Sequence, residues 1–432
     1  LALALARDPA VGAVHVAPGN PGTWAAEPAA PADPAPRVTL ADLKNLNPTD
    51  GAAVAALARD LAADLVVIGP EAPLVAGVAD AVRAAGIACF GPSAAAARLE
   101  GSKQFAKEVM AAAGVPTARS VYCTTPTEAA AALDAFGPPY VVKFDGLAAG
   151  KGVVVTADRA AALAHATDCG TVVIEEFLDG PEVSLFAVTD GVTAVPLLPA
   201  QDFKRVGDGD TGPNTGGMGA YCPLPWAPLD LVAETMRTVI EPTVAEMARR
   251  GTPFAGLLYA GLALTRHGLR VVEFNARFGD PETEAILPLL DSGLGSLLYA
   301  AAIGRLAEIG PLTWKDGAAV IVVLAARGYP GTPEKGGAIR DVPGSSLLTS
   351  PEDHVHIIHA GTALAPDGTL IAHGGRVLGV VADGPDLAAA RTRAYDAVAR
   401  LDFPTGFHRT DIAARGSGTV ATERGTSDSH GA

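Results

Sequence analysis

The sequence contains few cysteines and lacks a long apolar run. Its four cysteines among 432 residues, Cys89, Cys123, Cys169 and Cys222, form no C-x-x-C pair. This spacing argues against a zinc knuckle or a disulfide framework, and it is typical of a protein in a reducing cytoplasm. No stretch reaches the roughly 18 uninterrupted apolar residues of a membrane span, so we expect no membrane partner.

Basic side chains are scarce relative to acidic ones. The chain has 32 Lys and Arg against 47 Asp and Glu, which gives a net charge of −15, and no Lys/Arg run interrupts this surplus. Such a balance repels polyanions, so nucleic acid is not an expected partner, and small anions have to be met by local cations. The length allows about three domains, on a prior of roughly 150 residues each.

Residues 1–98 alternate helix-like and strand-like segments, which predicts an α/β unit with a parallel sheet. The predicted strands are 13–17, 65–68 and 87–90, and each is followed by a turn, at 18–23, 69–73 and 91–93. In open sheets ligands bind beyond the carboxyl ends of the strands, so these turns are expected to border one crevice. The alternative is that these three turns are ordinary loops that border no ligand site.

The first seven residues read as the end of a helix with no strand before it. Residues 1–6 are apolar, but Arg7 and Asp8 follow at once, so a signal peptide is not expected. We therefore expect a first strand and its phosphate-cradling turn to be missing from this sequence.

A second unit is expected to begin near residue 99. Ser102 is the predicted N-cap of a helix over 103–113 that ends at Gly114. Strands at 140–144 and 153–156 are predicted to form an antiparallel hairpin around the glycine-rich turn 145–152. Its Gly-Leu-Ala-Ala-Gly-Lys-Gly run is no P-loop, because it is one residue short, lacks the Ser or Thr, and leads into a strand. Lys143, between apolar neighbours, needs an anionic partner or an exposed face.

The next segments are predicted as strands 171–178 and 182–188, paired through the Asp179-Gly180 turn, with a possible hinge between them. Residues 201–221 contain six glycines and no apolar period, which indicates a long functional loop, with Met218 and Tyr221 docked. A helix over about 229–250 and strands at 257–265 and 269–275 follow.

The strand at 269–275 carries a candidate metal site. Period-two alternation places Val271, Glu273 and Asn275 on one face, and the other face holds Arg270 with the buried anchors Val272 and Phe274. Glu273 and Asn275 then lie about 6.6 Å apart, a spacing that lets a carboxylate and an amide oxygen bind one hard cation such as Mg²⁺ on nucleotide phosphates. A solvated strand face is the alternative.

The third unit begins past Gly310, with predicted strands at 319–326, 356–362 and 376–382 and a helix at 387–401. His354, His356 and His359 invite a metal interpretation, but with no fourth ligand in evidence a partly exposed strand is favoured. The small and polar tail from Gly416 is predicted to be disordered.

Several of these stretches together resemble the glycinamide ribonucleotide synthetase family of the ATP-grasp superfamily, over nearly the whole chain. The motifs that carry the resemblance are Gly69 to Leu74, Leu99 to Lys103, Lys143 to Gly152, Glu175 to Gly180, Asp210 to Tyr221, Glu273 to Glu282, His359 to Thr362 and Gly374 to Leu378. The resemblance implies an α/β and α+β fold. Its expected parts are a parallel-sheet (pre-ATP-grasp) domain over 1–98, an ATP-grasp domain over 99–312 with a lid at about 117–188, a mixed C-terminal domain over 313–415, and the tail 416–432.

The family reaction joins glycine to 5-phospho-D-ribosylamine in purine biosynthesis, through glycyl phosphate, and converts ATP to ADP and phosphate. The resemblance implies this activity for a cytoplasmic monomer. For the nucleotide it implies the adenine-edge residues Glu175, Glu176, Phe177 and Leu178, Glu182 at the ribose, and Lys103 and Lys143 at phosphates beneath the lid residues Gly150, Lys151 and Gly152. Glu273 and Asn275 would hold Mg²⁺ or Mn²⁺.

For the other substrates the resemblance implies two groups of residues. Arg277 and Asp280, as catalytic residues, would hold glycine and the acyl phosphate together with Asn214, Thr215, Gly216, Gly217, Met218 and Gly219. Further substrate-binding residues are Asp202, Lys204 and Arg205, while Asn20, Gly22 and Glu71 would face the phosphosugar.

Three departures from the family pattern qualify these expectations. The family's initial strand and its Gly-Gly-Arg-Glu-His-like turn are absent, which is expected to weaken phosphoribosylamine binding. The loop at 166–170 is short, so the lid is expected to close less well. Phe203 stands where relatives often have His, which removes one possible proton carrier.

Three rival functions are weighed against the ligase: a sibling ATP-grasp ligase that acts on another purine intermediate or on bicarbonate, a nucleotide-binding protein without turnover, and a sugar-binding protein with glycine-rich loops.

Overall fold

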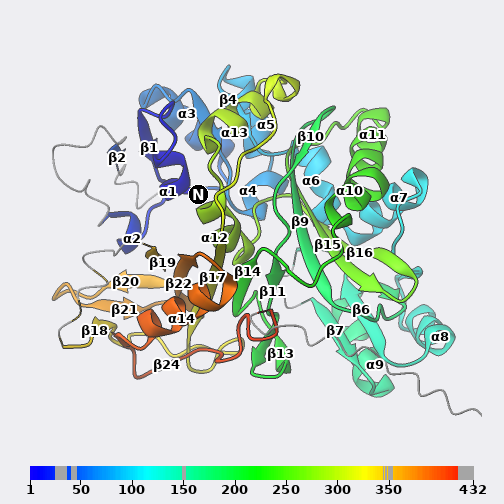
Figure 1. Cartoon of the computed structure of the whole chain (residues 1–432). Helices are drawn as coiled ribbons and strands as arrows, with labels where there is room; N and C mark the ends of the chain where they lie inside the picture. The colour runs from blue at the N-terminus through cyan, green and yellow to red at the C-terminus, as the bar shows by residue number, and fades with distance from the viewer. Residues whose placement is uncertain are drawn as a thin grey trace, which may run out of the picture.

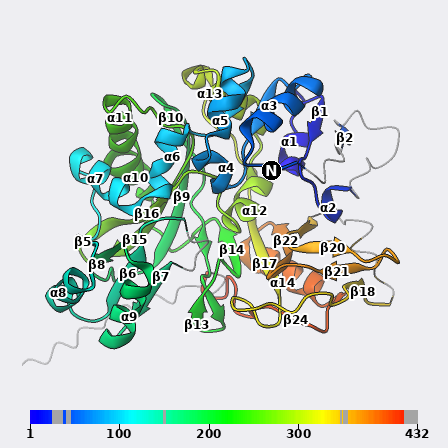
Figure 2. The same ribbon diagram turned by 180° about the vertical axis from the view of Figure 1, so that it is seen from behind.

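The computed structural model describes residues 1–24, 37–39, 46–147, 152–343, 345, 348 and 354–416. The predicted lid residues Gly150 and Lys151 and the predicted tail from 417 onward lie outside these residues. In Figure 1 the N-terminal elements (blue) lie above the C-terminal ones (orange), and the central part of the chain (cyan to green) lies beside both. Figure 2 shows the same arrangement from behind.

The N-terminal unit consists of short strands and helices in alternation, as the sequence predicts. Its elements are α1 (Ala2–Ala6), β1 (Ala13–His15), α2 (Pro21–Trp24), β2 (Arg37–Thr39), α3 (Gly51–Asp60), β3 (Leu65–Val67), α4 (Glu71–Val75), α5 (Val78–Ala84), β4 (Ala88–Phe90) and α6 (Ala94–Gly101). The pairing is parallel, which confirms the predicted strand direction, but β1 pairs with β2 and β3 with β4 in two separate sheets.

Helix α7 (Lys103–Ala113) leads into an antiparallel sheet that forms a small layer of its own. Ser102 caps α7 by accepting a hydrogen bond from the Phe105 amide, and Gly114 ends it at φ +67°, as predicted. The sheet has the order β5 (Ser120–Cys123), β8 (Val172–Glu175), β6 (Tyr140–Phe144), β7 (Val153–Thr156). Helices α8 (Pro126–Phe136) and α9 (Arg159–Cys169) pack on it through a separate apolar cluster. The predicted hairpin of β6 and β7 is confirmed.

The predicted pairing of strands 171–178 and 182–188 is wrong. Strand β8 ends at Glu175 and is flanked on both sides, by β5 and β6, so it has no free edge for the following strand. Strand β9 (Glu182–Asp190) instead joins a second sheet of order β10 (Ala194–Pro196), β9, β15 (Ala255–Thr265), β16 (Gly268–Asn275). Residues 176–181 therefore connect two sheets.

The segment 201–221 is also not the long loop that its glycines suggest. It contains β11 (Gln201–Asp202), β12 (Arg205–Gly207), β13 (Thr211–Asn214) and β14 (Gly219–Cys222). Strand β14 pairs with β17 (Ala318–Ala326) of the C-terminal unit, and Met218 and Tyr221 are buried, as predicted. The glycines hid the strands because glycine gives no alternating apolar pattern.

The remaining central elements are mostly helical. Helices α10 (Leu231–Thr235) and α11 (Glu241–Arg249) are joined by a π-helical turn (Met236–Ile240), which together match the predicted helix over 229–250. Helix α12 (Glu282–Ile286) follows β16 after a turn, and α13 (Leu294–Ala302) packs on β4 and β9.

The C-terminal unit is built on a six-stranded sheet, in which β17, β22 (Arg376–Gly384) and β19 (Val355–His359) are neighbours and α14 (Leu387–Val398) packs on β22. Short strands complete it: β18 (Arg340–Asp341), β20 (Thr362–Leu364), β21 (Leu370–Ala372), β23 (Leu401–Asp402) and β24 (Gly406–Phe407). His356 and His359 are half-buried on β19, which confirms the strand prediction. Within the part of the chain that the structure describes, every helix is too short or too polar to cross a bilayer.

Candidate active site

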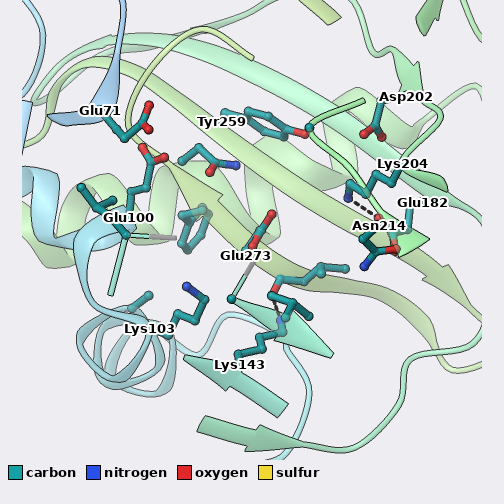
Figure 3. A pocket seen from close by; sticks show the side chains of 18 of the residues that line it. Glu71, Glu100, Lys103, Lys143, Glu182, Asp202, Lys204, Asn214, Tyr259 and Glu273 are labelled. Carbon is teal, nitrogen blue, oxygen red and sulfur yellow. Dashed lines mark hydrogen bonds and ion pairs between the residues drawn. The ribbon is translucent and has the colours of Figure 1, made fainter. Parts of the chain in front are cut away.

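One cavity of about 630 Å³ gathers most of the predicted site residues (Figure 3). It is lined by α6 and α7, by the sheet of β5, β8, β6 and β7 (the lid sheet), by β16, and by residues 176–178 and 214–216. The predicted residues in its lining are Glu71, Lys103, Lys143, Gly152, Glu175, Glu176, Phe177, Leu178, Glu182, Asp202, Lys204, Asn214, Thr215, Gly216, Glu273, Asn275, Arg277 and Asp280. Segments more than 200 residues apart in the sequence thus meet at one place.

Other predicted residues lie outside this lining. Arg205 donates to the Gly212 carbonyl, Gly217 donates to the Thr215 hydroxyl, and Met218 and Gly219 are buried beneath the loop. Asn20 and Gly22 lie against the C-terminal unit, where the Asn20 amide donates to the His359 carbonyl at 2.8 Å. The Asn20 side chain therefore links the N-terminal unit to the C-terminal unit.

Strand β16 departs from simple alternation at Val272. The register with β15 pairs Gly261 with Glu273 and Leu262 with Val271, so Val272 is an extra residue in a bulge. Because a bulge shifts the phase of the strand, Val271 and Phe274 are the buried anchors, and Val272 is only half-buried. The predicted face of Val271 and the predicted anchor Val272 are therefore wrong. Glu273 and Asn275 still share one face and both line the cavity.

The cavity wall carries nine carboxylates and six basic side chains, a surplus that favours a bound cation. Most of these charges are paired: Glu175 with Lys107 and Lys143, Glu182 with Lys204, Glu71 and Glu100 with Arg277, Asp280 with Arg376, and Glu176 with Arg119. Two of the charges that stay unpaired in the described part of the chain are Glu273 on β16 and Lys103 on α7. Among the described residues, the Glu273 and Asn275 side chains have no hydrogen-bond or ion-pair partner, and Lys103 has no carboxylate partner.

The Lys103 and Glu273 side chains carry opposite charges, and they lie close enough for the Glu273 carboxylate to affect the pKa of Lys103. Burial lowers the pKa of Lys103, and the nearby Glu273 carboxylate opposes that effect. Within the described part of the chain, the Lys103 ammonium donates only to the Gly146 carbonyl, at 3.2 Å. In the view of Figure 3, Glu273 lies between Lys103 on one side and Lys204 and Asn214 on the other. A half-buried lysine that has no acidic partner among the described residues is suited to an anionic ligand group.

A buried carboxylate bridges two lysines where β8, β6 and α7 meet at the cavity wall. Glu175 is 3% exposed, and its two oxygens lie 2.9 Å from Lys107 Nζ and 2.9 Å from Lys143 Nζ. Burial acts to raise the pKa of Glu175, but the two ammonium groups outweigh it and hold that pKa below its usual value. Lys143 also donates to the Val272 carbonyl at 2.8 Å, which ties the lid sheet to the bulge in β16.

The far wall of the cavity is a network of hydroxyls and acids. Tyr259 and Ser184 both donate to Glu282, at 2.5 Å and 2.9 Å, and Glu282 is 3% exposed. Asp202 lies nearby on β11. Burial raises the pKa of Asp202 from its usual 3.8 to about 7, although Lys204 acts in the opposite direction.

This raised pKa predicts a pH-dependent stability. The folded state binds the Asp202 proton more tightly than the unfolded state does, so the contribution is complete below about pH 4 and is lost as the pH rises through about 7. We expect the free energy of unfolding, measured in urea from pH 4 to 8, to fall more steeply with pH in the wild type than in Asp202→Asn. Parallel curves would contradict the assignment.

Five lining residues with polar or charged side chains received no role from the sequence: Glu100, Lys107, Tyr259, Glu282 and Arg376. Glu100, Glu282 and Arg376 lie inside motifs that carry the family resemblance. These motifs pointed to the three residues, but the neighbouring sequence did not indicate what each side chain contacts. Glu100 accepts from the Ala276 amide at 2.7 Å and faces Arg277 at 3.5 Å. Lys107 lies one helical turn after Lys103, a spacing that places both on one face of α7.

Comparison with known families accounts for this arrangement. Three family models of phosphoribosylglycinamide synthetase match consecutive parts of the chain: the N domain at residues 1–100, the ATP-grasp (A) domain at 101–283 and the C domain at 319–415. The chain belongs to the phosphoribosylglycinamide synthetase family. The resemblance seen in the motifs and the expected α/β and α+β fold class are thereby confirmed.

Individual relatives agree with the family models. The phosphoribosylamine–glycine ligase of Streptomyces coelicolor is 60% identical over 97% of this chain and 96% of its own length, and that of Mycobacterium leprae is 55% identical over 95% and 94%. The crystal structure of the Thermotoga maritima phosphoribosylamine–glycine ligase superposes with a TM-score of 0.68 at 38% identity, over 75% of this chain and 82% of that one. A biotin carboxylase from Campylobacter jejuni, at 15% identity and a TM-score of 0.63 over 85% of both chains, shares the fold.

Proposed function

We propose that this chain is an ATP-dependent ligase that joins glycine to 5-phospho-D-ribosylamine and releases ADP and phosphate, a reaction of purine biosynthesis. The observation that carries the proposal is membership of the family across three consecutive domain models, with close relatives of that activity over nearly the full length. The cavity with its free Lys103 and Glu273 supports it independently.

The chemistry explains why such a cavity suffices. A carboxylate is a poor electrophile, so glycine is first phosphorylated at its carboxyl group by the γ-phosphate of ATP. The amine of the phosphosugar then attacks the acyl carbon, and phosphate leaves. Both steps depend mainly on the alignment of reactants and on neutralisation of charge, which fixed lysines and arginines supply.

The nucleotide is proposed to lie between the lid sheet and β16. Because the Glu175 carboxylate is occupied by Lys107 and Lys143, the backbone of residues 176–178 is the better candidate for the adenine edge. Phe177, 48% exposed within the cavity lining, offers an apolar face to the base. Glu182 is proposed to bind ribose hydroxyls, and Lys103 and Lys143 to bind phosphates beneath the lid that includes Gly152.

Mg²⁺ or Mn²⁺ is proposed to be held by Glu273 and Asn275. The fit rests on their oxygens, which have no partner among the described residues, and on the surplus of acids in the wall. No group of three or more His, Cys, Asp or Glu side chains in those residues is placed to bind a metal, so phosphate oxygens would have to supply further ligands. When bound, the ion would neutralise charge on the transferring phosphoryl group.

Glycine and its acyl phosphate are proposed to bind at the other end, near Arg277, Asp280 and the Asn214 to Gly219 loop, with Asp202, Lys204 and Arg205 beside them. Glu71, and Asn20 with Gly22, are proposed for the phosphosugar. A monomer in the cytoplasm is proposed, and the four unpaired cysteines are consistent with a reducing compartment.

The proposal is tested by following ADP and product amide with ATP and Mg²⁺ in four mixtures: glycine alone, glycine with phosphoribosylamine, bicarbonate with phosphoribosylamine, and phosphoribosylamine alone. We expect ADP release with formation of the amide only in the mixture that contains both glycine and phosphoribosylamine. Release that requires bicarbonate would identify a sibling ligase. Binding of MgATP by calorimetry without turnover in any mixture would identify a nucleotide-binding protein.

A further inference from the structure

The C-terminal unit reaches the cavity through a single side chain. Among the described lining residues, Arg376 is the only one beyond Glu282 in the sequence. It is the first residue of β22, next to a break in the register between β17 and β22. Its side chain is 22% exposed, so a charge from the third unit is held at the wall of a site built by the other two.

Arg376 uses one nitrogen to hold two separate segments. Its Nη1 atom donates to the Gly216 carbonyl at 2.7 Å and to the Asp280 carbonyl at 3.0 Å, and it lies 2.9 Å from the Asp280 carboxylate. Hydrogen bonds from a charged donor are stronger than neutral ones, so this nitrogen fixes the glycine loop against the turn that follows β16.

A second residue of the C-terminal unit contacts the same glycine through its amide. The Gly216 amide donates to the Tyr329 hydroxyl at 2.9 Å. The Tyr329 ring lies against Gly375, where a Cβ atom would come within 2.4 Å of it. Gly216 is thus bound through both its amide and its carbonyl by residues of the C-terminal unit.

The loop itself has little room to move. Gly217 has φ +107°, and a Cβ atom there would lie 2.4 Å from Pro281 Cδ, so the loop packs directly on the turn that carries Asp280. Thr215 is 7% exposed and its hydroxyl donates to the Lys204 carbonyl at 2.8 Å. The loop position therefore depends on contacts with three parts of the chain.

We propose that Arg376, assisted by Tyr329, is a positioning residue of the ligase reaction: it sets the Thr215 to Gly217 loop and the Asp280 turn at the glycine and acyl-phosphate end of the cavity. The inference rests on the proposed function. It gives the C-terminal unit a defined part in catalysis, because without that unit the loop loses both contacts of Gly216.

The test measures steady-state kinetics for glycine and the binding of a nonhydrolysable MgATP analogue by calorimetry. Removal of the charged contacts in Arg376→Ala is expected to lower kcat/KM for glycine by about tenfold to a hundredfold. The Kd for the ATP analogue is expected to stay within about twofold, since the proposed nucleotide residues do not contact Arg376. Arg376→Lys keeps the charge, but its side chain ends one bond short of the Nη1 position, so it is expected to recover only part of the loss.

Tyr329→Phe distinguishes a loss of loop positioning from a loss of the positive charge of Arg376. It removes the hydroxyl that accepts from Gly216 and leaves the charge intact, so a loss of several-fold in kcat/KM for glycine supports positioning of the loop. Arg327→Ala is the matched control, because Arg327 belongs to the same unit but pairs with Glu334 at the surface, with 62% of its side chain exposed. It is expected to behave as wild type.

Three outcomes would overturn the inference while leaving the ligase activity established: unchanged glycine kinetics in Arg376→Ala, an equal loss of ATP-analogue binding, or a silent Tyr329→Phe combined with full recovery in Arg376→Lys. A wild-type chain with no glycine-dependent turnover would instead overturn the proposed function.

Discussion

Glu273→Gln is expected to lower glycine-dependent turnover by at least on the order of 10²-fold, while the melting temperature stays within about 1 °C of wild type. The reason is the isolation of this carboxylate. It lines the cavity but has no partner among the described residues, so removal of its charge breaks no bond that holds the fold. Under the proposed metal assignment, the variant loses one ligand of a divalent ion beside the phosphates of ATP.

The measurement combines steady-state rates at several Mg²⁺ concentrations with calorimetric titration of MgATP. We expect Glu273→Gln to require more Mg²⁺ for any residual rate, and Asn275→Ala to show a smaller change in the same direction. Glu241→Gln, at an exposed position in the first turn of α11, controls for the loss of one negative charge and should leave the rate unchanged. A Glu273→Gln enzyme with a near-normal rate would remove the metal assignment.

Motif and period were sufficient to predict many of the helices and strands, because these elements depend on local sequence. Lys143 on a hairpin strand, Ser102 as a cap, and Glu273 with Asn275 on one face follow from their neighbours in the chain. The family resemblance then supplied what local patterns could not: which distant motifs belong to one cavity.

Predictions that depend on strand partners were less successful. Strand β8 and strand β9 both look like halves of a hairpin, but β8 already has β5 and β6 on its two edges. The bulge at Val272 is set by the register with β15, and no feature of residues 269–275 alone indicates it. Strand β14 was hidden by glycines, although its pairing with β17 brings the Thr215 to Gly217 loop to the C-terminal unit.

Side chains that serve a distant partner were missed for the same reason. Lys107 meets Glu175 from another element, and Arg376 meets Gly216 from 160 residues away. A lysine one turn after Lys103 on an amphipathic helix also reads as an ordinary surface residue. The role of Lys107 becomes apparent only when Glu175 is seen to lie between Lys107 and Lys143.

The second large effect is expected at Glu175. Glu175→Gln is expected to lower the free energy of unfolding by about 3–5 kcal/mol, because it leaves the buried Lys143 and the partly buried Lys107 ammonium groups without their ion-pair partner. Urea titration of the wild type and the variant, without ligand, measures the loss. Affinity for MgATP should fall as well, since the Lys143 ammonium, which also donates to the Val272 carbonyl, is no longer held by the Glu175 carboxylate.

The neighbouring residue provides a matched control for this prediction. Glu176 pairs with Arg119, whose side chain is 76% exposed, so water screens that pair and Glu176→Gln should change stability by less than about 1 kcal/mol. A double substitution, Glu175→Gln with Lys107→Met, leaves one unpaired ammonium in place of two and is expected to recover part of the lost stability. It should not restore MgATP affinity, because Lys143 would still lack its carboxylate. If Glu175→Gln proved as stable as Glu176→Gln, the bridge between the two lysines would not be what holds the lid sheet against β16.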